Sequence, residues 1–99
     1  MNKTFSYKSK IWIYPGEAAW YFVSIVGKTA EEIRALQTKL PKRGFGSIRV
    51  SVTLGESSWD TSIFRDNRSG GYLLPIKKSI RKKEGVWEGD EVELKIAIR

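Results

Sequence analysis

The sequence predicts a mainly β (α+β) domain, a small and partly open β-barrel of about six strands with two short capping helices. Apolar and polar residues alternate over several short stretches, glycine or proline separates these stretches, and only two segments show helical spacing. With 99 residues, 40% of them hydrophobic, the chain is long enough for one core. We therefore treat residues 1–99 as a single β-barrel domain.

The N-terminal part predicts an antiparallel pair of strands. In residues 4–14 (TFSYKSKIWIY), odd positions from Phe5 to Ile13 share one face of a strand, and even positions share the other. Residues 15–19 (PGEAA) form a turn. Residues 20–26 (WYFVSIV) are rich in the aromatic and β-branched residues that are typical of strands.

Residues 28–40 (KTAEEIRALQTKL) predict the first helix. Thr29 and Glu32 have the spacing of a capping box, and apolar residues recur at helical intervals up to Leu40. Pro41 is expected to end this helix.

The rest of the chain predicts a second helix and four more strands. Pro75 fits the first position of that helix, and Gly85 fits the left-handed position that ends it. Between them, Ile76 and Ile80 are spaced to face the core. The expected strands are residues 47–54 (SIRVSVTL), 59–64 (WDTSIF), 72–74 (YLL) and 91–98 (EVELKIAI).

The chain contains no histidine and no cysteine, which excludes Ser-His-Asp and Cys-His catalysis, imidazole metal ligands and disulfides. The acidic residues of segment 88–93 lack the ligand spacing of a calcium loop and are expected to balance neighbouring cations. No catalytic motif is present. We favour a non-enzymatic protein without cofactor or metal, and an enzyme with a carboxylate, lysine or tyrosine base stays open.

The longest apolar run is too short to span a bilayer, and no signal-peptide core follows the N-terminal lysines. We expect a cytoplasmic protein that does not bind membranes. The formal net charge of +7 favours an anionic partner, such as nucleic acid, a phosphorylated ligand or an acidic protein.

Five cations lie within residues 77–83, and this basic segment has two interpretations. In the first, the segment is a solvated helix face, whose cations interact with the helix dipole and with nearby carboxylates. In the second, Lys77 and Arg81 share a face that binds an anion, with Lys78 in the same first turn. The predicted ligand-binding residues are Lys77, Arg81, Lys78, Arg43, Trp59, Thr61, Ser62 and Tyr72.

The tryptophans are interpreted mainly as packing residues. Trp12, Trp20 and Trp59 lie on predicted strands and are expected in the core or lining the barrel. Trp87 lies in a turn and is expected to pack over the end of the second helix. If one tryptophan contacts a ligand, we expect Trp59, because polar residues follow it closely.

Four segments together resemble the domain of unknown function 1905 family, and they cover nearly the whole chain. The resemblance implies a small β-barrel with helical caps, found alone or fused to a bacteriocin-resistance-like domain. It implies no particular biochemical role. The segments are residues 18–26 (AAWYFVSIV), 42–55 (KRGFGSIRVSVTLG), 59–64 (WDTSIF) and 70–92 (GGYLLPIKKSIRKKEGVWEGDEV).

The C-terminal third also resembles the half-barrel of AbrB-like transcription factors, with a strand, Pro75, a helix carrying Ile80 and Arg81, the turn Gly89–Asp90 and a final strand. The resemblance implies an interleaved dimer that presents arginines to DNA. Here residues 20–52 would supply a degenerate first half. One chain then completes the barrel, which favours a monomer over a homodimer.

These observations predict a non-enzymatic binding module that holds nucleic acid or a phosphorylated small molecule at its basic helix. Two alternatives stay open. One is a protein-interaction or structural domain with no specific anion site, and the other is an AbrB-like DNA-binding regulator.

Overall fold

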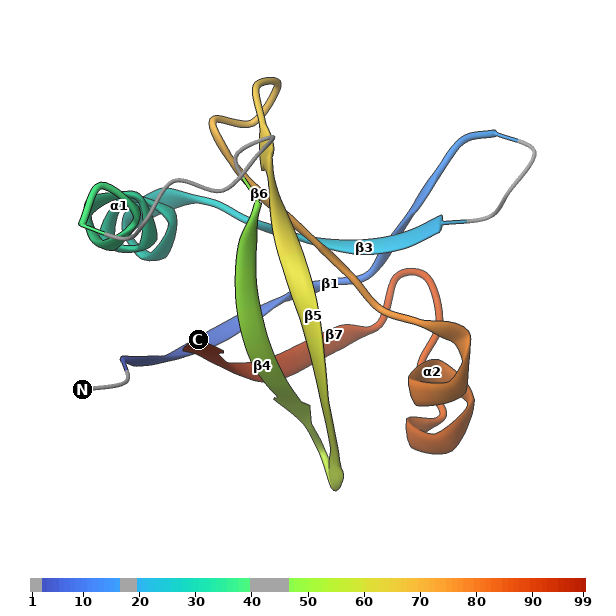
Figure 1. The fold of residues 1–99 in the computed structure, drawn as a ribbon. Helices are drawn as coiled ribbons and strands as arrows, with labels where there is room; N and C mark the ends of the chain where they lie inside the picture. The colour runs from blue at the N-terminus through green and yellow to red at the C-terminus, as the bar shows by residue number, and fades with distance from the viewer. Residues whose placement is uncertain (1–2, 17–19, 40–46) are drawn as a thin grey trace.

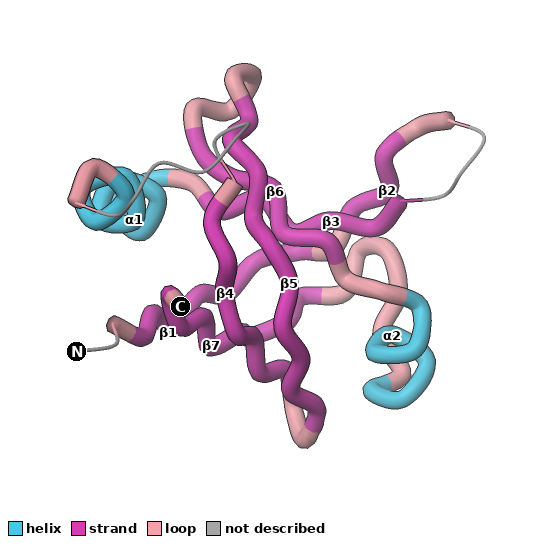
Figure 2. The backbone as a smooth tube through the Cα atoms, in the orientation of Figure 1, coloured by secondary structure: helices cyan, strands magenta, loops and turns pink. Residues whose placement is uncertain are grey.

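Seven antiparallel strands form one curled sheet in the part of the chain that the structure describes, residues 3–16, 20–39 and 47–99 (Figure 1, Figure 2). The structure is a computed structural model, and its strands follow the order β1-β7-β4-β5-β6-β3-β2. The predicted mainly β, partly open barrel with two short helices is confirmed. The elements are β1 (Thr4–Lys10), β2 (Trp12–Tyr14), β3 (Trp20–Ile25), α1 (Gly27–Gln37), β4 (Ile48–Leu54), β5 (Ser57–Asp66), β6 (Gly71–Pro75), α2 (Lys78–Glu84) and β7 (Glu91–Ile98).

The two strands at the ends of the sheet, β1 and β2, are neighbours in the sequence and are separated only by Ile11. β1 pairs with β7, whereas β2 pairs with β3. At the break, the N–H of Ile11 donates to the carbonyl of Asp90 (3.0 Å), and its carbonyl accepts from the N–H of Gly89 (2.8 Å). The sheet curls because consecutive residues join its two ends. The prediction of one unbroken strand over residues 4–14 is therefore wrong at Ile11, and the split adds a strand.

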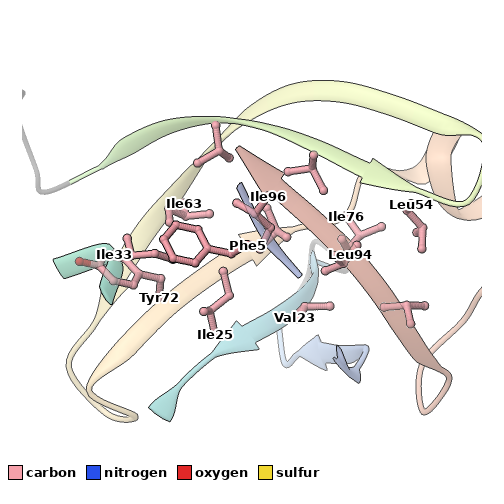
Figure 3. Close-up of a cluster of buried hydrophobic side chains, with 14 of the residues drawn as sticks. Phe5, Val23, Ile25, Ile33, Leu54, Ile63, Tyr72, Ile76, Leu94 and Ile96 are labelled. Carbon is pink, nitrogen blue, oxygen red and sulfur yellow. The ribbon is translucent and has the colours of Figure 1, made fainter. Parts of the chain in front are cut away.

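The core lies on the concave side of the sheet (Figure 3). The alternation predicted in the segments now seen as β4 and β7 is confirmed, since every second side chain of both strands is buried. Aromatic and aliphatic side chains from the strands and from α1 point toward one another. The residues labelled in Figure 3 are Phe5, Val23, Ile25, Ile33, Leu54, Ile63, Tyr72, Ile76, Leu94 and Ile96.

The helices α1 and α2 lie on opposite sides of the barrel (Figure 1). α1 buries Ile33, and Nη2 of its Arg34 donates to the carbonyl of Gly70 (2.8 Å). α2 is anchored by Ile76 and Ile80, which are buried as predicted. Among the described residues, no helix has the length and apolar character needed to cross a membrane.

The first helix begins earlier than predicted. α1 begins at Gly27 and has no side-chain hydrogen bond at its N-cap, so the predicted capping box at Thr29 is wrong. It ends at Gln37. Leu40 and Pro41, expected to complete and stop the helix, lie outside the described residues.

Pro75 ends β6 rather than opening α2, which begins at Lys78. Strand pairing continues past the proline, because the N–H of Ile76 donates to the carbonyl of Tyr21 (2.9 Å). β6 pairs with β5 only over residues 71–73, so the missing N–H of Pro75 costs no hydrogen bond between strands.

Replacement of Gly71 by alanine is expected to destabilise the domain by a steric clash. A Cβ at this position would overlap the carbonyl oxygen of Ile25, a backbone atom that cannot rotate away. We expect the free energy of unfolding, measured by urea denaturation, to fall by about 3 kcal/mol.

The control for this prediction is Gly85→Ala. Gly85 ends α2 in the left-handed conformation, as predicted, with a φ of 66° and no atom within 4 Å of an added Cβ. Alanine there is expected to cost only the backbone strain, about 1 kcal/mol. A smaller loss at Gly71 than at Gly85 would contradict the close approach of β6 to β3.

Candidate functional site

Four aromatic side chains lie together on the outer side of the hairpin formed by β2 and β3. The register pairs Trp12 with Phe22 and Tyr14 with Trp20. Residues directly opposite in paired strands project to the same side, so these four share one side. The buried Val23 projects to the other side, into the core. We call Trp12, Tyr14, Trp20 and Phe22 the aromatic face.

Phe22 is the centre of the aromatic face. The ring centroids of Trp12 and Phe22 are 5.5 Å apart, and Trp20 stacks on Phe22 with an interplanar angle of 10°. Tyr14 meets Phe22 edge-on at 6.3 Å. These are the offset and edge-to-face arrangements that aromatic pairs prefer. The rings therefore form one ordered surface.

This surface is open to solvent. Trp20 is 55% exposed and Tyr14 is 42% exposed, while Trp12 and Phe22 are half-buried. The indole N–H of Trp12 donates to the hydroxyl of Ser24 (2.8 Å), which satisfies its polar group and holds the ring in place. The hairpin extends away from the barrel, as Figure 2 shows. Large aromatic rings on strands are usually packed, so an exposed group of them indicates a contact surface.

The opposite side of the hairpin rests on α2 through Arg81. The guanidinium carbon of Arg81 lies 3.5 Å from the ring centroid of Tyr21. Its Nε–H donates to the carbonyl of Ile76 (3.0 Å), and the N–H of Ile76 bonds to Tyr21 in turn. Arg81 is only 8% exposed. Its role in this structure is to position the hairpin from beneath.

Lys77 lies next to the aromatic face by register. β3 and β6 pair Phe22 with Pro75, and the bond between Ile76 and Tyr21 extends the pairing by one residue. Continued by one further residue beyond the end of β6, this register would bring Lys77 opposite Trp20. The backbone of Lys77 is extended, with φ −69° and ψ 157°, so alternation places this exposed residue on the outer side.

The structure places the other described site residues in different surroundings. Trp59 and Tyr72 are buried in the core, and the hydroxyl of Tyr72 donates to Oε1 of Gln37 on α1 (2.7 Å). Lys78 is exposed in the first turn of α2. On β5, Thr61 is half-buried opposite Val50, and Ser62 accepts a hydrogen bond from Arg49. Arg43 lies outside the described residues.

The expectations for the tryptophans are partly wrong. Trp59 is a core residue as predicted, but Trp20 is mostly exposed. The sequence did contain a signal for the outer position of Trp12 and Tyr14. Trp12 and Tyr14 share the even-numbered face of residues 4–14 with two lysines, opposite the apolar face. The side on which Trp20 lies depends on the register across residues 15–19, which alternation alone does not determine.

Comparison with known families adds a classification to this geometry. The model of the family described as "Domain of unknown function (DUF1905)" matches residues 7–96. The chain belongs to the DUF1905 family. The match includes the aromatic face and Lys77. A comparison with curated proteins finds no match. The function of this DUF1905 protein is therefore argued from its own residues.

Replacement of Arg81 by methionine is expected to lower the free energy of unfolding by about 2 kcal/mol, because the contact with Tyr21 and the bond to Ile76 are lost. Urea denaturation measures this loss. Lys82→Met is the matched control, since Lys82 is an exposed neighbour on α2. We expect a change within about 0.5 kcal/mol for the control. Equal losses in the two variants would contradict the supporting role of Arg81.

Proposed function

We propose that this DUF1905 protein is a non-enzymatic module that binds single-stranded nucleic acid, and that the aromatic face holds the bases by stacking. The observation that carries the proposal is the ordered and exposed set of rings on the β2–β3 hairpin. Nucleic acid is also one of the anionic partners that the net charge of +7 favours.

Stacking supplies enough free energy for such binding. A base stacked on an aromatic side chain contributes about 1–3 kcal/mol, and every base has a π-face, so the interaction tolerates any sequence. Trp20 and Tyr14 offer the most exposed rings of the aromatic face. Phe22 supports Trp20 from the side, with parallel planes, and a base placed on Trp20 would extend an existing stack.

The charges near the face suit a phosphate backbone. Lys77 is exposed, and because it follows Ile76, whose N–H donates to Tyr21, continuation of the register would bring it near Trp20. Among the described residues, β2, β3 and β6 place no carboxylate on their outer side. When the bases of a nucleic acid stack on the rings, its phosphates therefore lie near a cation. No carboxylate on these three β-strands repels them.

The exposed rings of the aromatic face favour a single strand over a duplex. Bases in a duplex are already stacked on one another and present only their edges in the grooves. Unpaired bases can turn outward and lie on aromatic side chains. A phosphorylated small molecule would use Lys77 but would leave most of the aromatic face open.

Trp20→Ala is expected to weaken the binding of labelled single-stranded oligonucleotides by about tenfold or more, because a stacking ring is lost. Fluorescence anisotropy measures the affinity, with duplexes of the same sequence in parallel. Trp87→Ala is the matched control, since Trp87 is 59% exposed but lies in the turn before β7. Trp20→Phe keeps a ring and is expected to recover part of the affinity.

The result that would refute the aromatic site is equal binding by the wild type and Trp20→Ala. If the wild type binds no oligonucleotide, the aromatic face serves another partner, and a protein surface is the next candidate.

Lys77→Gln is expected to reduce the salt dependence of binding. Loss of one phosphate contact lowers the slope of log affinity against log salt by about 0.7 for a single strand. Titrations between about 50 and about 200 mM salt measure this slope. Lys82→Gln removes the same charge from an exposed position on α2. Equal slopes for both variants would mean that only bulk charge acts.

A further inference from the structure

The outer side of the sheet carries a further exposed aromatic ring, which lies outside the hairpin. Phe64 on β5 is 44% exposed, whereas its neighbour Ile63 is fully buried. The register pairs Phe64 with Leu73 of β6, and Leu73 pairs with Ser24 of β3 on its other side. Phe64 therefore projects to the same side as the aromatic face.

Two side chains of β6 bridge the gap between Phe64 and the aromatic face. Pro75 pairs with Phe22, and Leu73 lies between Ser24 and Phe64. Both bridging residues are half-buried and uncharged. The outer side of β2, β3, β6 and β5 is thus mainly apolar, and Ser24 of β3, whose hydroxyl accepts a hydrogen bond from Trp12, is a polar side chain on the path.

A cation lies beyond Phe64, on the next strand. Arg49 of β4 is exposed, pairs with Ser62 and donates through Nη1 to the hydroxyl of that serine (3.3 Å). Ser62 is two residues from Phe64 on the same side of β5. Arg49 is therefore a diagonal neighbour of Phe64. In ordinary strand geometry, the backbone positions of such neighbours are about 7–8 Å apart.

Asp60, a carboxylate whose charge interacts with that of Arg49, has other partners. Asp60 accepts a hydrogen bond from Ser51 (2.7 Å) and forms an ion pair with Arg99. The hydrogen bond from Ser51 has the largest effect on Asp60 and lowers its pKa; desolvation raises the pKa, and Arg99 and Arg49 lower it further, so that the pKa lies below its usual value. Arg49 meets a hydroxyl at hydrogen-bonding distance, and a phosphate would be a stronger partner.

We infer that Phe64 and Arg49 form a second subsite for the same nucleic acid, so that a bound strand crosses from the hairpin over β6 to β5 and β4. This inference rests on the function proposed above. Phe64 stacks one base and Arg49 contacts a phosphate. Leu73 and Pro75 line the path between the subsites.

The distance between the subsites sets the length of the ligand. From β2 to β5 there are three steps between neighbouring strands. At about 4.8 Å each, they span about 14 Å. A stacked strand rises about 3.4 Å per nucleotide, so about four or five nucleotides reach from one subsite to the other. Shorter oligonucleotides occupy only one subsite.

Oligonucleotide length separates the two subsites in an experiment. Fluorescence anisotropy is measured for labelled oligothymidylates of about 3 and about 12 nucleotides, with the wild type and Phe64→Ala. We expect the variant to bind the longer one about tenfold more weakly and the shorter one with unchanged affinity. Phe64→Tyr keeps the ring and is expected to bind both like the wild type.

Arg49→Gln tests the phosphate contact independently. We expect its salt slope to fall by about 0.7 for the longer oligonucleotide only. Arg68→Gln is the matched control, because Arg68 is an exposed arginine in the turn between β5 and β6.

The outcomes distinguish this inference from the proposed function. If the longer oligonucleotide binds and depends on Trp20 but not on Phe64, the second subsite is refuted and the aromatic face stands. Equal weakening of both lengths by Phe64→Ala also refutes a separate subsite. If the wild type binds neither the short nor the long oligonucleotide, both proposals are refuted together.

Discussion

The break in the N-terminal strand at Ile11 is the constraint on which the shape of this domain depends. One residue joins the two ends of a seven-stranded sheet, and its backbone is bonded to the turn before β7. A flat sheet cannot satisfy that connection, so the sheet curls and acquires an inner side that holds the core. Because of the same break, β2 does not continue the pairing with β7 and pairs with β3 instead. The hairpin thereby leaves the wall of the barrel, and one of its sides faces solvent.

A hairpin that leaves the barrel needs support from another element, and α2 provides it. Arg81 lies against Tyr21 and bonds to the carbonyl of Ile76, so the inner side of the hairpin is packed by a residue that is usually exposed. In the described part of the chain, no helix covers the outer side in this way, and Trp20 and Tyr14 are exposed there. The rings of the outer side stabilise one another by about 0.5–1.5 kcal/mol per pair, but burying Trp20 would contribute more than stacking it in water. Folding stability alone therefore does not account for four aromatic residues at these positions.

The parts of the fold that were predictable depend on local pattern. Alternation with a period of two is a property of neighbouring residues, so the buried faces of β4 and β7 follow from the sequence. Long-range pairing is a different matter. The split at Ile11 depends on a turn almost eighty residues away along the chain, and nothing near Ile11 indicates it. The burial of Arg81 depends in the same way on the position of Tyr21. For the candidate site, the cluster of cations in the sequence predicted a site at α2. The exposure of Trp20 was not predicted, because it depends on the register between β2 and β3.

The cations of the basic segment have separate surroundings, which changes the interpretation of the segment. Arg81 points inward and is committed to the hairpin. Lys82 and Lys83 are exposed in the last turn of α2, where cations interact favourably with the helix dipole. Lys77 precedes the helix and continues the outer side of β6 toward Trp20. The candidate site is thus not formed by the seven-residue helix α2 itself. The end of β6 joins one cation of this segment to the aromatic face, and that junction combines a charge with a stacking surface, as single-strand binding requires.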